Sequence, residues 1–161
     1  MKPFEIVETN LDFGDLSERE QTNMIVVHHV GEITRDVSAE EIHGWHKNNG
    51  WSGIGYHFVI RKDGTIERGR PQEMIGSHAK GFNWESVGIN VVGDFEQEEP
   101  MPEQVESLAR LVAYLEDQYA ELQVSGHRDL MSTDCPGANL YCLLPDLGGK
   151  VEYYQANGLD S

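Results

Sequence analysis

Three side chains in this sequence have the types and the placement of a metal site that can carry out hydrolysis. His28 follows an apolar run at residues 24–27, and His127 and Cys135 lie eight residues apart in a second segment. Imidazole and thiolate together are a ligand set that suits zinc. Structural zinc sites close with four protein ligands, whereas catalytic sites keep three and leave a position for water. The three residues therefore predict one zinc ion and a hydrolase.

The residue types alone do not settle which histidine of the pair His28 and His29 is the ligand. Successive residues of a strand face opposite sides, so only one of the two can point at the site. A buried histidine satisfied by the core is the ordinary alternative for His28 considered by itself.

Cys135 also has alternative chemistries. With His127 nearby it could be a nucleophile with its base, as in cysteine peptidases. The following Pro136 argues against this, because a reactive thiol is often activated by backbone N–H groups at a helix N-terminus and proline has none to donate. A disulfide with Cys142 is a further alternative, disfavoured in an acidic, cytosolic-looking chain.

Composition narrows the class of protein. The chain has 161 residues, 39% hydrophobic and 25% charged, as expected for one globular domain. Its net charge of −16 leaves no basic surface for nucleic acid. No apolar stretch approaches the roughly 20 residues of a membrane span. The first residues lack the apolar core of a signal peptide, so we expect synthesis in the cytoplasm and release by a holin or another route.

The pattern of apolar residues predicts strands interleaved with helices, which is typical of a single α/β domain with a mixed central sheet flanked by helices. A capping box at Ser38 opens one helix, and a second begins at Pro102. We expect strands at 24–29, 55–61, 66–68, 87–92 and 124–126, a hairpin turn at 62–65, helices at 38–48, 102–119 and 140–147, and a helical turn near 16–19. We divide the chain into an N-terminal extension packed on the domain (1–23), the catalytic domain (24–148) and a polar tail (149–161).

A series of short motifs in one order resembles the zinc-dependent N-acetylmuramoyl-L-alanine amidase family, which includes phage lysozyme-amidases and peptidoglycan recognition proteins. The resemblance covers roughly residues 24–140, and the phage type is the more similar. The motifs are Val26-Val27-His28-His29, Trp45-His46-Lys47, Gly50-Trp51, Gly55-Tyr56-His57-Phe58, Asp63-Gly64-Thr65, Gly76-Ser77-His78-Ala79-Lys80-Gly81, Ser86-Val87-Gly88-Ile89, Gly126-His127-Arg128-Asp129 and Asp134-Cys135-Pro136-Gly137.

The resemblance implies that His28, His127 and Cys135 are the zinc ligands and that Tyr56 is catalytic. The implied substrate is peptidoglycan, cut at the amide between N-acetylmuramic acid and L-alanine. The phage enzymes carry lysine two residues before the cysteine, where this chain has Thr133, as several recognition-protein amidases do. A threonine hydroxyl can donate to an oxyanion but brings no charge, so we expect Tyr56 and Thr133 to be the catalytic side chains.

Other polar and aromatic residues receive weaker assignments. We expect His78 and Trp84 to contact substrate, Trp51 to pack in the core and His57 to be structural. His43 and His46 lie three apart on the first helix, which favours a solvated polar face. Asp129 and Asp134 could either orient ligands or cap loops.

Two other functional classes remain open from the sequence. One is a module that binds peptidoglycan without cutting it, although all four implied ligand and tyrosine positions are filled here. The other is a regulator that acts on a partner protein through its acidic surface. We expect the protein to be a monomer.

Overall fold

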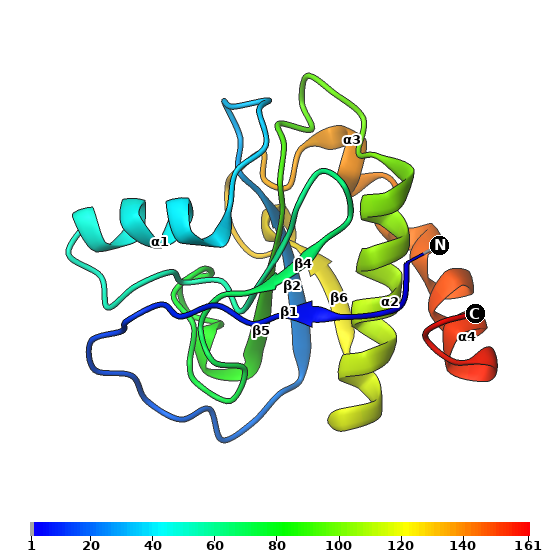
Figure 1. Ribbon diagram of the computed structural model, residues 1–161, viewed down its shortest axis with the longest axis horizontal. Coiled ribbons are helices and arrows are strands. Elements are labelled where there is room, and N and C mark those ends of the chain that lie inside the picture. Colours follow the sequence, from blue (N-terminus) through cyan, green and yellow to red (C-terminus); the bar gives the residue numbers. More distant parts are fainter. Residues whose placement is uncertain (1) are drawn as a thin grey trace.

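The computed structural model describes residues 2–161 and has a six-stranded sheet at its centre, in the order β1-β4-β3-β5-β2-β6 (Figure 1). The strands β3 and β4 are antiparallel and the other neighbours are parallel. The sheet is thus mixed, which confirms the predicted α/β class. The strands are β1 (Ile6–Val7), β2 (Met24–His29), β3 (Phe58–Ile60), β4 (Ile66–Arg68), β5 (Ser86–Val91) and β6 (Gln123–Gly126).

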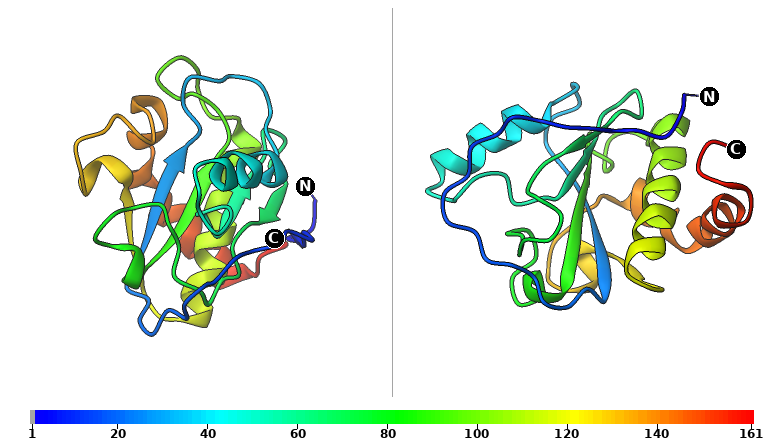
Figure 2. Two further views of the ribbon diagram at one scale, coloured as in Figure 1. Left: turned by 90° about the vertical axis from the view of Figure 1, so that its left-hand side faces the viewer. Right: turned by 60° about the horizontal axis from the view of Figure 1, so that its bottom comes forward.

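Helices cover the two faces of this sheet unequally. Figure 1 shows α2 and α4 on one side and α1 on the other, and both views of Figure 2 agree. The helices are α1 (Ala39–Asn48), α2 (Pro102–Gln118), α3 (Ala138–Tyr141) and α4 (Leu147–Asn157), with short 3₁₀ turns η1 (Asn83–Glu85), η2 (His127–Asp129) and η3 (Leu144–Asp146). The Ser38 side chain accepts a hydrogen bond from the backbone N–H of Glu41 at 3.1 Å, as the capping box predicts.

Strand β2 lies between β5 and β6, and every one of its residues is buried. Ile25 and Val27 point towards α2 and join the main core, which α2 completes with Leu108 and Leu111. The alternate residues of the strand face the other side, where His28 lies opposite Asn90 of β5. The local reason for β2 is its run of branched apolar residues, which suits a strand buried on both faces.

The structure corrects several predicted elements. Residues 55–57 form a bend before β3 rather than part of the strand, and the predicted helical turn near 16–19 is extended, with Glu18 bridging to Met74. The predicted helix at 140–147 is two short elements, α3 and η3. The expected polar tail carries α4, because Val151 and Tyr154 pack against the core. Strand β1 was not predicted, since it has only two residues.

The N-terminal segment runs along the edge of the sheet, and its first described residues lie beside the C-terminus (Figure 1). Ile6 of β1 pairs with Ile66 of β4, and the backbone N–H of Phe4 donates to Asp160 Oδ1 at 2.5 Å. Arg110 of α2 donates to the same carboxylate at 3.2 Å. Asp160 therefore connects both ends of the chain to α2.

Among the described residues, no helix combines the length and the apolar character needed to cross a bilayer.

Candidate active site

His28, His127 and Cys135 come together at the carboxyl end of the parallel strands. Their ligand atoms all lie within 4.8 Å of one another, and His28 Nδ1 is 3.6 Å from Cys135 Sγ. The ring centroids of His28 and His127 are 4.5 Å apart. Strand β2 supplies His28, η2 after β6 supplies His127, and the loop before α3 supplies Cys135. Three distant parts of the sequence thus meet at one point.

The backbone explains why His28 and not His29 points at this cluster. His29 faces the other side of β2, where its Nδ1 accepts a hydrogen bond from the backbone N–H of Phe95 at 3.1 Å. Only the backbone of His29 reaches the cluster, since its N–H donates to Cys135 Sγ at 3.4 Å. The side-chain geometry therefore separates two neighbours that the residue types alone could not.

The surroundings of Cys135 do not suit a nucleophile. Burial raises the pKa of its thiol to about 12, whereas a reactive cysteine needs a lowered pKa. The imidazole nitrogen that lies 3.6 Å from its sulfur is Nδ1 of His28, not a nitrogen of the proposed base His127. Cys135 and Cys142 are both free, so the structure also contradicts the alternative of a disulfide.

The donor atoms fit a zinc ion. Ligand distances of about 2.0–2.1 Å to nitrogen and about 2.3 Å to sulfur, at tetrahedral angles, place the two atoms about 3.5 Å apart. The observed separation of His28 Nδ1 and Cys135 Sγ is 3.6 Å. Burial lowers the pKa of both His28 and His127, which favours the neutral imidazole that binds a metal.

Tyr56 lies beside this cluster, in the bend before β3. Its ring is 4.9 Å from that of His28. Burial and the nearby Cys135 raise the pKa of the phenol, and the amide of Asn90 works in the opposite direction. A raised pKa favours the protonated hydroxyl, which is a hydrogen-bond donor at neutral pH.

Asn90 is a candidate site residue that no sequence motif indicated. Its side chain is 1% exposed, and its Oδ1 has no hydrogen-bond partner among the described residues. Buried polar atoms are usually paired, so an unpaired one beside a cluster of this kind indicates a missing partner. The only sequence signal would have been its position opposite His28, which depends on the pairing of β2 with β5.

Thr133 lies in the loop that carries Cys135. Its Oγ1 accepts a hydrogen bond from the backbone N–H of Cys135 at 3.3 Å, which leaves the hydroxyl hydrogen free to donate elsewhere. Asp129 accepts hydrogen bonds from the backbone N–H of Gly126 and from the Tyr141 hydroxyl, so it stabilises the loop. Asp134 is exposed at the rim of the site.

A cavity of about 550 Å³ opens over the cluster, and the aromatic residues around it differ from those predicted. Trp51, expected in the core, is 43% exposed and lines the cavity, with its ring 4.5 Å from that of His46. His46 was expected on a solvated helix face, but it also lines the cavity. Its ring is held there by a hydrogen bond, which its Nδ1 accepts from the backbone N–H of Gly55 at 2.9 Å. Its helix neighbour His43 is buried and accepts from Ile54 in the same way. Trp84 lies outside the cavity, at η1, where its indole N–H donates to Gly81.

His78 does line the cavity, yet its ring nitrogens are used within the protein. Its Nδ1 lies 2.9 Å from His28 Nε2, and its Nε2 lies 3.2 Å from Ser86 Oγ. His57, predicted to be structural, accepts a hydrogen bond from the backbone N–H of Gly88 at 3.0 Å. It also lies 2.7 Å from the Met74 carbonyl.

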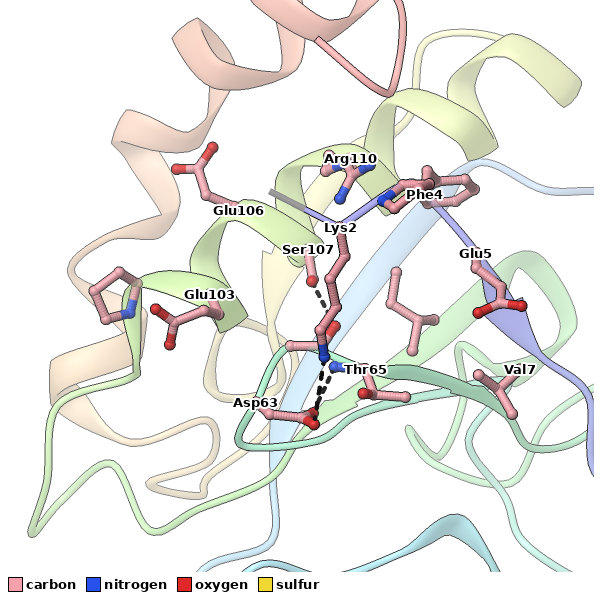
Figure 3. A pocket seen from close by; sticks show the side chains of 14 residues that line it. Lys2, Phe4, Glu5, Val7, Asp63, Thr65, Glu103, Glu106, Ser107 and Arg110 are labelled. Atoms are coloured by element: carbon pink, nitrogen blue, oxygen red, sulfur yellow. Dashed lines mark hydrogen bonds and ion pairs between the residues drawn. The ribbon is translucent and has the colours of Figure 1, made fainter.

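A larger cavity of about 810 Å³ lies elsewhere, between the N-terminal segment, the β3–β4 turn and α2 (Figure 3). Lys2 reaches across it to Asp63 at 3.8 Å, and Ser107 donates to the Gly64 carbonyl at 2.6 Å. None of the described residues that line this cavity is a histidine or a cysteine. The histidines and the cysteine of the candidate site therefore belong to the smaller cavity.

Comparison with known proteins agrees with this site. The sequence profile of the family described as N-acetylmuramoyl-L-alanine amidase matches residues 18–138. The chain belongs to the N-acetylmuramoyl-L-alanine amidase family. The matched segment contains Tyr56 and all three clustered residues.

Individual relatives support the same assignment. The endolysin of Klebsiella phage KP32 is 39% identical over 130 residues, which cover 77% of this chain and 86% of that protein. The structure of the N-acetylmuramoyl-L-alanine amidase LysC from Clostridium intestinale URNW is 42% identical, with a TM-score of 0.86 over 92% of this chain and 97% of that one. Wild-type Drosophila PGRP-LB is 25% identical, with a TM-score of 0.79 over 87% of this chain and 92% of that one. This amidase therefore hydrolyses the amide bond between N-acetylmuramic acid and L-alanine in peptidoglycan.

Proposed function

We propose that the amidase cuts this bond with one zinc ion held by His28, His127 and Cys135. The observation that carries the proposal is the convergence of two imidazoles and one thiol, with His28 Nδ1 and Cys135 Sγ at the separation that tetrahedral zinc requires. Three protein ligands leave a coordination position for the reaction. When bound, zinc supplies Lewis acidity and a nucleophile at neutral pH.

Around that ion, the chain's own residues have distinct tasks. Tyr56 is a protonated phenol beside His28, and we propose that it donates a hydrogen bond to the oxygen that becomes negative as the amide carbonyl is attacked. We propose that Thr133 donates a second one, because its oxygen already accepts from the backbone N–H of Cys135 and its hydroxyl hydrogen is free. Neither residue needs to change its charge during the reaction.

The cavity supplies the surface on which the muramyl stem peptide binds. Trp51 presents an exposed aromatic ring at the cavity, next to His46, whose own ring lies near that of Tyr56. Such a ring can pack against the apolar face of a sugar or a peptide. We propose that Trp51 takes the part that the sequence suggested for Trp84, which lies outside the cavity.

One chain contributes every residue of this site, so we propose that the protein works as a monomer. The substrate lies in the cell wall, and we infer that the protein acts there after release through a holin or by another route.

The test is release of soluble stem peptide from purified peptidoglycan, with metal content measured on the same preparations. The wild type should contain one zinc per chain and release peptide with a free L-alanine N-terminus. Cys135→Ser and chelator-treated wild type should both lose zinc and activity. Zinc added back should restore the chelator-treated wild type but not Cys135→Ser. Tyr56→Phe should keep its zinc and lose roughly 10²–10³-fold in kcat.

Two results would contradict the proposal. Cleavage that is unaffected by chelator would exclude zinc hydrolysis. Stoichiometric zinc with binding of peptidoglycan but no released peptide would favour a non-catalytic binding module, the role that the sequence left open.

A further inference from the structure

We propose that a hydrogen-bond relay from the Phe82 carbonyl through Ser86 and His78 fixes which nitrogen of His28 carries its proton. The inference rests on the proposed role of His28 as a zinc ligand and adds a positioning function for His78. The relay ends at His28 Nε2, 2.9 Å from His78 Nδ1, while His28 Nδ1 faces Cys135 Sγ.

The direction of the relay follows from its far end. The Phe82 carbonyl can only accept, so the Ser86 hydroxyl donates its one hydrogen there, at 2.8 Å. Ser86 Oγ can then only accept from His78 Nε2, which lies 3.2 Å away and must be the protonated nitrogen of a neutral His78.

The same logic continues to His28. A neutral imidazole protonated at Nε2 has a lone pair on Nδ1, so His78 Nδ1 accepts and His28 Nε2–H donates. His28 Nδ1 is left bare on the side of Cys135, which is the state that a metal ligand needs. The Phe82 carbonyl oxygen, three hydrogen bonds away, thus selects the tautomer of His28.

The fold provides a fitted niche for the His78 ring. A Cβ at Gly88 of β5 would lie 2.6 Å from His78 Cγ, and one at Gly76 would lie 2.7 Å from His78 Cδ2, both closer than real contacts allow. The rings of His28 and His78 are perpendicular, at 85° and 5.0 Å. Ser86 is fully buried. Two glycines that leave room for one ring indicate that its position is under constraint.

This arrangement assigns His78 a role different from substrate contact. Outer hydrogen-bond partners of metal-bound histidines typically contribute 10–100-fold in metal affinity or activity. A substrate contact would instead change KM and leave the affinity for zinc alone.

The experiment compares four variants with the wild type by zinc affinity, using competition with a chromophoric chelator. His78→Leu should bind zinc 10–100-fold more weakly. His78→Asn places an amide oxygen near the position of Nδ1 and should recover most of the affinity. Ser86→Ala should show a smaller loss. Ser107→Ala is the matched control, because it also removes a buried hydroxyl that donates to a carbonyl, at Gly64, and should match the wild type.

A second measurement reports the tautomer directly. Imidazole ¹⁵N chemical shifts of the metal-free wild type should show His28 protonated at Nε2, and His78→Leu should give a mixture of tautomers. Wild-type zinc affinity in His78→Leu, or an unchanged His28 tautomer in that variant, would overturn the relay. A raised KM with unchanged zinc affinity would also overturn it, in favour of substrate contact. If the wild type binds no zinc, the proposed function fails, while the tautomer measurement still decides the relay.

Discussion

The two faces of the central sheet are made by the same strands and have opposite chemistry. On the face covered by α2 and α4, β2 and β5 present aliphatic side chains, among them Ile25 and Ile89. On the other face the same two strands present His28 and Asn90, opposite each other. The alternation of side chains along a strand separates the two sets by a single residue.

This difference separates stability from chemistry. The helix-covered face contains the large aliphatic cluster, whose burial is the main favourable term in folding. The opposite face contains histidines held by specific hydrogen bonds and smaller apolar clusters under α1 and the loops. Changes on the two faces should therefore affect different measurements, and the following predictions test that separation.

The largest effect should come from removing a ligand on the site face. His127→Ala should lower amidase activity by at least about 100-fold, beyond the range typical for an outer partner of a metal ligand. The free energy of unfolding of the metal-free protein should change little, because His127 is only partly buried in η2. Peptide release and urea unfolding in the presence of chelator measure the two quantities. A large loss of stability in the metal-free variant would contradict the separation.

The converse change lies on the helix-covered face. Leu111 of α2 is fully buried in the main cluster, so Leu111→Ala should lower the free energy of unfolding by roughly 2–5 kcal/mol. Activity per folded molecule should stay near that of the wild type at a temperature well below the unfolding transition. Denaturant titration with parallel kinetics checks this. A fall in kcat comparable to that of His127→Ala would show that the two faces are coupled.

Asn90 tests whether polarity on the site face opposes stability. Its Oδ1 is buried and unpaired, and only its amide group hydrogen-bonds, to Tyr56, so Asn90→Leu should lower the unfolding free energy by less than about 1 kcal/mol or raise it, while activity falls about tenfold or more. Gln104→Met is the matched control. Gln104 is equally buried, but it donates to the Val92 carbonyl at 2.9 Å and accepts from Met101, so its loss should cost about 1–3 kcal/mol. Equal destabilisation by both variants would mean that Asn90 is satisfied in solution.

The sequence predicted the elements whose pattern is local and long enough to be periodic. Strand β2 and helices α1 and α2 appear within a residue or two of their predicted bounds. Strand β1 is too short to have a period. Helix α4 buries few side chains and contains Gly148 and Gly149, so its sequence lacks the apolar pattern that predicts a helix.

The site was predictable only where a motif or a strand end indicated it. The three clustered residues follow from such positions, and their role as ligands stays a prediction. The partners of His46, His78 and Asn90 come from other elements: Gly55 after α1, His28 on β2 and the pairing of β5 with β2. A sequence read along one element shows residue types but not these contacts. For that reason His46 was assigned to a solvated face and Asn90 received no assignment.

The smallest effect should come from a single histidine titrating on the site face. Burial, with smaller contributions from Arg70 and His43, lowers the pKa of His46 to about 4 from its ordinary value of 6.5. Between these values the unfolded chain binds the proton and the folded protein does not. Titration of His46 therefore costs no stability above pH 6.5 and lowers the free energy of unfolding as the pH drops towards 4.

His46→Asn keeps an acceptor for the Gly55 N–H without a titratable ring, so its loss of stability on acidification should be shallower than that of the wild type. Urea unfolding of the metal-free proteins at pH 7 and pH 5 measures this difference. Leu111→Ala, altered on the other face, should keep the wild-type pH dependence although its stability is lower throughout. Identical pH dependence in wild type and His46→Asn would place the acid sensitivity elsewhere, and a changed dependence in Leu111→Ala would show that the two faces do not titrate independently.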